Sequence, residues 1–143
     1  MSKREGSIED LVGREHRFLD ALFAELLETL ERNAEPSVAQ NVLTRLRDAL
    51  ERHLLQEERL YYSALRALAP AHRSALLHFS DAHDTFRTRL AALESGMLDA
   101  APAQARSLLL AIARDFARHE AGEEQFLREI DREIHAGETS SPS

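Results

Sequence analysis

Apolar side chains recur every three or four positions along four long stretches of the sequence, and each stretch therefore predicts a helix that buries one face. Capping and helix-breaking residues place these helices at residues 7–33, 36–69, 71–96 and 102–136. Short connections between helices of similar length favour an up-down-up-down four-helix bundle, so the predicted fold class is all-α. The bundle is expected to occupy residues 1–136, and residues 137–143 to form a disordered tail.

The second half of the sequence repeats the first. Apolar positions such as Leu50 and Phe116 correspond at a shift of 66 or 67 residues, which predicts two helical hairpins related by a pseudo-twofold axis. The repeat also places polar residues in the apolar stripes at matching points. His16 corresponds to His83, and the pair His53 and Glu57 corresponds to the pair His119 and Glu123.

These four histidines and two glutamates all fall on positions that face the predicted core. A His four residues before a Glu puts both side chains on one face of a helix. Taken singly, a core His is more often a hydrogen-bonded residue than a ligand, and a His/Glu pair is more often a surface pair. Two carboxylates buried at the depth of four histidines are costly without a cation, so the whole set predicts a two-metal site.

The predicted ligands are imidazole nitrogens and carboxylate oxygens, which suit Fe, Mn or Zn better than soft metals. Two bridging glutamates and two histidines per metal would give each metal four protein ligands. Iron prefers five or six ligands, so solvent, a bridging oxo or hydroxo group and an exogenous ligand would complete the shell. The chain has no Cys, which excludes disulfides, Cys-ligated metals and thiol catalysis.

Charge and hydropathy restrict the classes of partner. The net charge is −7 and the Arg residues are scattered, whereas a nucleic-acid module is usually basic with a clustered patch. No apolar run approaches the roughly 20 residues that a membrane crossing needs. The first residues also lack the apolar region of a signal peptide. We therefore expect no nucleic-acid partner, no membrane partner and a cytoplasmic location.

The series His16, His53-x-x-x-Glu57, His83 and His119-x-x-x-Glu123 resembles the hemerythrin-like (HHE cation-binding) family over about residues 7–130. The resemblance implies a four-helix bundle around two iron ions, a non-haem di-iron centre that binds dioxygen or a related small ligand. It assigns His16 and His53 to one iron, His83 and His119 to the other, and Glu57 and Glu123 to bridging positions.

The sequence departs from the oxygen-carrying hemerythrins at two points. The carriers have a fifth His four residues from the ligand of the third helix, where this chain offers only Phe79 or Arg87. Water, a distant Tyr or another carboxylate are the candidates for that vacancy. The carriers also place the second bridging carboxylate five residues after the His, which would be Glu124. We favour Glu123, because i+4 lies about 40° from the His on a regular helix and i+5 about 140°.

Neighbouring residues have two interpretations each. Tyr61 continues the stripe of His53 and Glu57, where it either packs in the core, which we favour, or donates a hydrogen bond to the site. Glu58 and Glu124 either accept hydrogen bonds from ligand imidazoles or are ordinary surface charges.

Three functions fit this sequence. The first is binding or sensing of O₂ or a related small ligand at a di-iron site. The second is an enzyme that acts on peroxide or nitric oxide, or that repairs iron centres; the di-iron repair proteins usually carry an extra Cys-containing segment, and this chain has no Cys. The third is iron storage or an iron-responsive interaction module, in which metal binding would couple strongly to folding.

Overall fold

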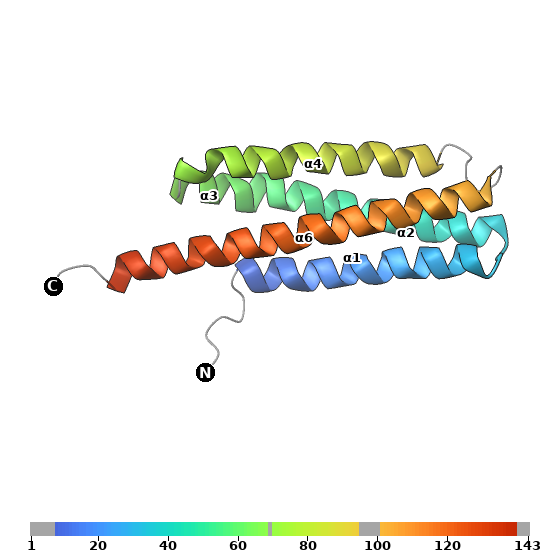
Figure 1. Ribbon diagram of the computed structural model, residues 1–143, viewed down its shortest axis with the longest axis horizontal. Helices are drawn as coiled ribbons and strands as arrows, with labels where there is room; N and C mark the ends of the chain where they lie inside the picture. Colours follow the sequence, from blue (N-terminus) through green and yellow to red (C-terminus); the bar gives the residue numbers. More distant parts are fainter. Residues whose placement is uncertain (1–7, 69, 95–100, 140–143) are drawn as a thin grey trace.

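The computed structural model describes residues 8–68, 70–94 and 101–139. Long helices pack side by side, and no strand occurs in these ranges, so the all-α four-helix bundle is confirmed (Figure 1). The elements in chain order are α1 (Ile8–Glu31), α2 (Pro36–Gln56), the π-helical turn η1 (Glu57–Tyr61), α3 (Tyr62–Leu68), the 3₁₀ turn η2 (Pro70–His72), α4 (Arg73–Ala92) and α6 (Pro102–Thr139).

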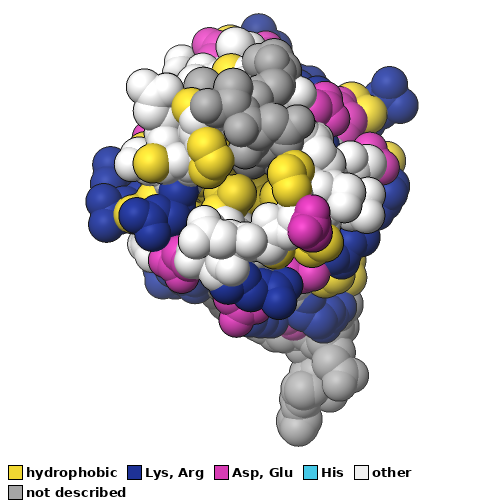
Figure 2. All heavy atoms as spheres, turned by 90° about the vertical axis from the view of Figure 1, so that its right-hand side faces the viewer, with side chains coloured by type: hydrophobic (Ala, Val, Ile, Leu, Met, Phe, Trp, Pro, Cys, Tyr) yellow, Lys and Arg dark blue, Asp and Glu magenta, His cyan; other side chains and the backbone are white. Residues whose placement is uncertain are grey.

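The long helices α1, α2, α4 and α6 alternate in direction, and each of them contacts two of the others (Figure 1). The helix α1 packs against α2 and α6, while α4 packs against α6 and α2 (Figure 1). No helix in the described ranges combines the length and the apolar character that a membrane crossing requires. Viewed from the end where α1 finishes and α2 begins, apolar side chains occupy the middle of the face and charged ones surround them (Figure 2).

Helix boundaries mostly follow the predicted signals. Asn33 adopts a left-handed backbone conformation with φ of 51° just after α1, a conformation that Asn tolerates better than most residues. Pro36 and Pro102 begin α2 and α6, since proline is compatible with the first helical turn. The predicted starting residue Ser7 and most of the connection at residues 97–101 lie outside the described residues.

Several helix boundaries differ from the prediction. The helix α4 ends at Ala92 rather than near residue 96. The helix α6 continues to Thr139, so residues 137–139 are helical rather than part of a tail, and residues 140–143 lie outside the described residues. A single Gly within a helix costs only about 1 kcal/mol relative to Ala, which explains why Gly137 does not end α6. The predicted start of the third helix near Ala71 falls in the 3₁₀ turn η2, and α4 begins at Arg73.

The predicted second helix is helical from Pro36 to Leu68 but is not one regular α-helix. At η1 the backbone N–H of Tyr62 bonds to the carbonyl of Glu57, five residues earlier, instead of the usual four. One additional residue is thereby accommodated between Glu57 and Tyr62. Every side chain after this turn is rotated by about 100° relative to the phase that a regular helix would have.

The core consists of two apolar clusters separated by a polar layer. One cluster contains Leu19, Leu50 and Phe116, and the other contains Val12, Leu76 and Phe126. On each helix the predicted site residues lie between members of the two clusters. The layer is therefore enclosed by apolar side chains on both sides along the bundle axis.

Candidate metal centre

The structure brings together all six residues that the sequence singled out. Each comes from the inner face of its helix, and five of them are almost completely buried, whereas His119 is half-buried. The exposed fractions of the five are 2% for His16, 5% for His53, 1% for Glu57, 0% for His83 and 1% for Glu123.

Around His16 and His53, which we call the first half of the centre, three nitrogen-to-oxygen separations are short. His16 Nε2 lies 3.0 Å from Glu123 Oε1 and 3.5 Å from Glu57 Oε2. His53 Nε2 lies 3.0 Å from Glu57 Oε2. One ligand atom from each of these four residues lies within 4.8 Å of the other three, a spacing that one metal ion can span.

Around His83 and His119, the second half of the centre, the two Nε2 atoms are 3.2 Å apart. His83 Nε2 lies 3.3 Å from Glu57 Oε1 and 3.9 Å from Glu123 Oε2. Each glutamate therefore directs one carboxylate oxygen toward each half. Ligand atoms from His83, His119 and Glu123 form a second group within 4.8 Å.

Most of these inward-facing atoms lack a hydrogen bond. Nε2 of His16 and of His53, both oxygens of Glu57 and Oε1 of Glu123 are buried without a hydrogen-bond partner. Buried polar atoms are nearly always satisfied in proteins. Two ligands each about 2.1 Å from one metal, at a right angle, lie about 3 Å apart, which is the spacing found here. The residues present therefore fit a pair of metal ions.

Carboxylates outside the centre fix the orientation of three of the four imidazole rings. Glu124 pairs with His16 Nδ1, Glu15 with His53 Nδ1 and Glu58 with His83 Nδ1, each at 2.8 Å. Such partners leave Nε2 free to bind a metal and increase its basicity.

These contacts also distinguish Glu123 from Glu124, the two candidates for the second bridging carboxylate. Glu123 faces the inside of the bundle, next to His16 Nε2, whereas Glu124 pairs with Nδ1 on the outer side of the same ring. The role of Glu15 was not anticipated, because it comes from a different helix than His53 and no helical spacing relates the two residues.

The close approach of buried imidazoles and carboxylates shifts their pKa values. Burial alone would lower the pKa of His16, but the carboxylates of Glu123 and Glu57 more than offset it and raise the pKa to about 11. Burial would raise the pKa of Glu57, yet the facing rings of His16, His53 and His83 hold it well below its usual range. Protons thus balance the buried carboxylates in the metal-free protein, and a cation would take their place.

His119 and Glu123 behave differently. Burial lowers the pKa of His119 to about 4, and the neighbouring charge of His83 adds to the effect. Burial raises the pKa of Glu123 to about 7; His16 opposes the shift and Glu57 adds to it. A neutral imidazole is the form that binds metal, so His119 requires no deprotonation at neutral pH.

One tyrosine at the centre was missed by the sequence analysis. Tyr62, not Tyr61, reaches the layer: its hydroxyl donates to Glu123 Oε2 and lies 3.2 Å from His83 Nε2. Tyr61 is buried among apolar residues of the cluster around Val12 and Phe126, in agreement with the core-packing interpretation. The π-helical turn explains the difference, because it shifts the inward-facing position by one residue.

Glu120 is a second buried residue that the sequence did not reveal. Its Oε2 lies 3.7 Å from His16 Nδ1 and has no hydrogen-bond partner. Burial, together with Asp20, raises its pKa to about 9. It is therefore a neutral acid at pH 7. Its side chain, which is 4% exposed, leaves no uncompensated charge in the core.

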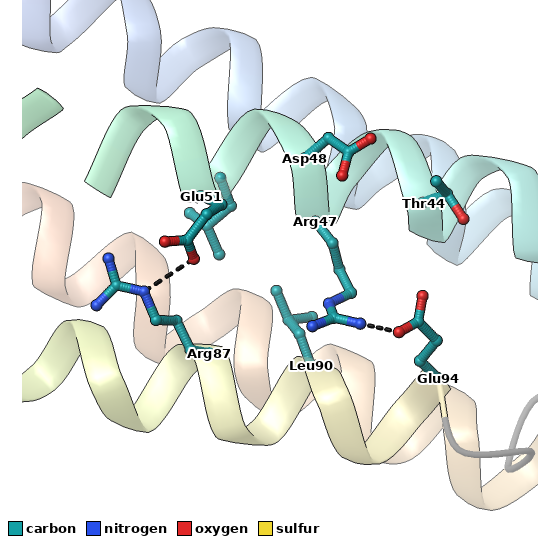
Figure 3. Close-up of a pocket in the computed structure, with 8 residues that line it drawn as sticks. Thr44, Arg47, Asp48, Glu51, Arg87, Leu90 and Glu94 are labelled. Atoms are coloured by element: carbon teal, nitrogen blue, oxygen red, sulfur yellow. Dashed lines mark hydrogen bonds and ion pairs between the residues drawn. The ribbon is translucent and has the colours of Figure 1, made fainter. Parts of the chain in front are cut away.

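Phe79 and Arg87 occupy the two positions at which a fifth His was sought. Phe79 packs edge-on against the ring of His119, with centroids 5.6 Å apart. Arg87 points outward and bonds to Glu51 across a groove between α2 and α4 (Figure 3). It also bonds to Glu58 of η1. Arg87 therefore acts on the centre only indirectly, by holding the carboxylate that holds His83.

Two further surface grooves border the centre. One, of about 210 Å³, is lined by Glu15, Phe18 and His53 from α1 and α2. The other, of about 360 Å³, is lined by Phe79, Ala82, Phe86, His119 and Gly122 from α4 and α6. The two grooves correspond under the sequence repeat, but a carboxylate borders the first at the place where Ala82 borders the second.

Comparisons with known proteins agree with this geometry. No curated protein and no solved structure matches the chain significantly. The family described as the hemerythrin HHE cation-binding domain matches residues 7–130, a range that contains every residue of the centre. With its helical bundle and its buried cluster of His and Glu that can hold metal, the chain belongs to the hemerythrin HHE cation-binding domain family.

Proposed function

We propose that the protein is a non-haem di-iron protein that binds O₂ or a related small ligand, with His16, His53, Glu57, His83, His119 and Glu123 as the metal ligands. One observation carries the proposal. The two oxygens of Glu57, and likewise those of Glu123, are divided between the two histidine pairs, as bridging carboxylates require. Iron at this centre would supply open coordination positions and electrons for a diatomic ligand.

The chain's own residues position the ligands and restrict water. Glu124, Glu15 and Glu58 fix three imidazole rings before any metal arrives, which reduces the ordering required on binding. Phe116 lies against His16 and Phe86 against His119, at centroid distances of 6.2 and 5.4 Å. These apolar rings favour a small uncharged ligand over a large polar one.

Metal analysis of purified protein tests the centre. The wild-type chain is expected to hold two irons, and His53→Ala to lose iron from the first half. His78→Ala is the matched control, because His78 is exposed and lies outside the layer. Equal iron content in wild type and His53→Ala would contradict the ligand assignment.

Rapid mixing of the di-ferrous protein with O₂ tests the binding function. We expect a reversible spectral change that is lost when O₂ is removed. Steady turnover of H₂O₂ or NO well above that of free iron would instead favour the enzyme. A storage protein would be recognised by uptake of far more than two irons per chain.

A further inference from the structure

The second half of the centre has fewer closely spaced ligand atoms than the first. In the first half four residues, Glu57 among them, place ligand atoms within 4.8 Å of one another, whereas in the second half His83, His119 and Glu123 do so. Glu57 Oε1 faces the second half, 3.3 Å from His83 Nε2, but is not part of that group. The Tyr62 side chain lies beside this smaller group and is 3% exposed. Its oxygen is close to two of the three ligand atoms, Nε2 of His83 at 3.2 Å and Oε2 of Glu123.

The distance between the Tyr62 oxygen and His83 Nε2 matches other distances between candidate ligand atoms in the centre. It equals the 3.2 Å between His83 and His119, and resembles the 3.3 Å between His83 and Glu57. Atoms that share a metal at right angles are about 3 Å apart. The Tyr62 ring also stacks on the ring of His83, with centroids 5.6 Å apart and planes inclined by 25°, which fixes the direction of its hydroxyl.

The backbone is modified at the point that brings Tyr62 inward. The π-helical turn lies directly between Glu57 and Tyr62, and a regular α-helix would direct Tyr61 to the same face instead. The corresponding part of α6 is α-helical throughout, so this turn has no counterpart after Glu123. Turns of this type occur frequently at functional sites.

We propose that the Tyr62 oxygen is a protein ligand of the metal ion in the second half, in the place of the absent fifth His. The inference rests on the di-iron centre proposed above. A phenolate oxygen is a hard, anionic donor and suits ferric iron together with imidazole and carboxylate. The phenol proton, which Tyr62 donates to Glu123 in the metal-free site, leaves to solvent when the cation binds.

The absorption spectrum of the ferric protein tests this assignment. Tyrosinate bound to Fe³⁺ gives a visible charge-transfer band, and excitation in that band enhances phenolate ring vibrations in the Raman spectrum. We expect both signals in the wild type and in Tyr61→Phe, and neither in Tyr62→Phe. The chain has two Tyr and no Trp, so Tyr61→Phe leaves Tyr62 as the sole tyrosine. A positive Tyr61→Phe spectrum therefore assigns the band even when Tyr62→Phe fails to fold.

A redox-inert cation provides a second measurement. Binding of Ga³⁺ is expected to produce the ultraviolet difference spectrum of tyrosinate in the wild type and in Tyr61→Phe only. Two irons per chain without the tyrosinate signals would overturn the role of Tyr62 and leave the di-iron centre standing. A wild-type protein that holds no iron would overturn the centre, and the Tyr62 assignment with it.

Discussion

In the first half of the centre, both imidazole rings are held by carboxylates from neighbouring helices, whereas in the second half only His83 has such a partner among the described residues. The difference arises at one position of the repeat. Glu15, which holds His53, corresponds to Ala82 beside His119. The first half is therefore built for fixed coordination, while the second is more open and contains Tyr62. A shared sequence pattern has produced two unequal groups of candidate ligands.

Replacement of Glu57, one of the two glutamates that face both halves, is expected to have the largest effect. Glu57→Gln removes the negative charge that His16, His53 and His83 face, so iron content should fall from two per chain to nearly none. The metal-free protein should also lose about 3 kcal/mol of stability at pH 7 because a buried charge cluster is left unbalanced. Elemental analysis and urea unfolding measure the two effects. Glu28→Gln, on an exposed position, is the control; equal iron content in both variants would be inconsistent with a bridging role.

Proton competition should next distinguish His16 from His119. The pKa of His83 is raised like that of His16, because Glu57 and Glu58 more than offset the effect of its burial. The pKa of His16 in the metal-free fold is about 11, above the ordinary 6.5, so its bound proton stabilises that fold below pH 6.5, and this contribution disappears as pH rises through 11. A metal displaces the proton, so affinity should rise about tenfold per pH unit for each proton displaced. His119, with a pKa near 4, is already neutral at pH 7.

Titration of ¹⁵N-labelled metal-free protein by NMR checks these protonation states. His16 should remain protonated at pH 8 and His119 should be neutral at pH 6. Calorimetry of metal binding in buffers of different ionisation enthalpy counts the protons released. Metal affinity that does not change between pH 6 and 8 would contradict this account of the first half.

Removal of one orienting carboxylate should weaken one half alone. Glu15→Gln is expected to lower affinity at the first position by about 10- to 100-fold, because His53 loses the partner that fixes its ring. Stepwise competition with a chelator resolves the two metals. Loss of both metals in parallel would mean that the halves do not bind independently.

Addition of the absent carboxylate is the converse experiment. Ala82→Glu, placed beside His119 in the groove between α4 and α6, should raise the pKa of His119 above its value near 4, because a nearby carboxylate favours the charged imidazole. Affinity at the second position should rise by about tenfold at most. NMR titration measures the pKa, and Ala82→Gln controls for size. An unchanged pKa would show that position 82 does not reach the imidazole.

The smallest effect is expected at the outer surface. Arg87→Gln removes the partner of Glu58, which in turn holds His83, but partly exposed ion pairs contribute only about 0.2–1 kcal/mol. Affinity at the second position should fall two- to fivefold. Arg89→Gln, which breaks a pair with Asp115 instead, should leave it unchanged. A larger loss in Arg89→Gln than in Arg87→Gln would be inconsistent with the Arg87–Glu58–His83 connection.

Helical periodicity was sufficient to predict the bundle and the residues that meet in its centre. Both follow from which side chains share a face, and a regular helix fixes that relation. The choice of Glu123 over Glu124 as the inward carboxylate followed from the same geometry, and the structure places Glu124 outside. The ligand roles of these residues remain predictions until metal has been measured.

The features that were missed do not depend on regular periodicity. Tyr62 points inward because a π-helical turn breaks the phase, and residues 57–61 carry no Pro or Gly to indicate that break. Glu15 and Glu120 act across helix–helix contacts, and their partners depend on how the helices dock. One sequence alone contains no signal for such pairings.

The bonds that orient the imidazoles also constrain when the centre can form during folding. His16 and Glu124 are 108 residues apart in the chain, and His83 and Glu58 are 25 apart on different hairpins. A single hairpin therefore lacks the complete ligand set, and of the three oriented imidazoles only His53 has its partner, Glu15, on its own hairpin. Contacts at such long sequence separation form late, after the loss of chain entropy that they require. Metal capture should therefore follow docking of the two hairpins, and its rate should report on the last step of folding rather than on helix formation.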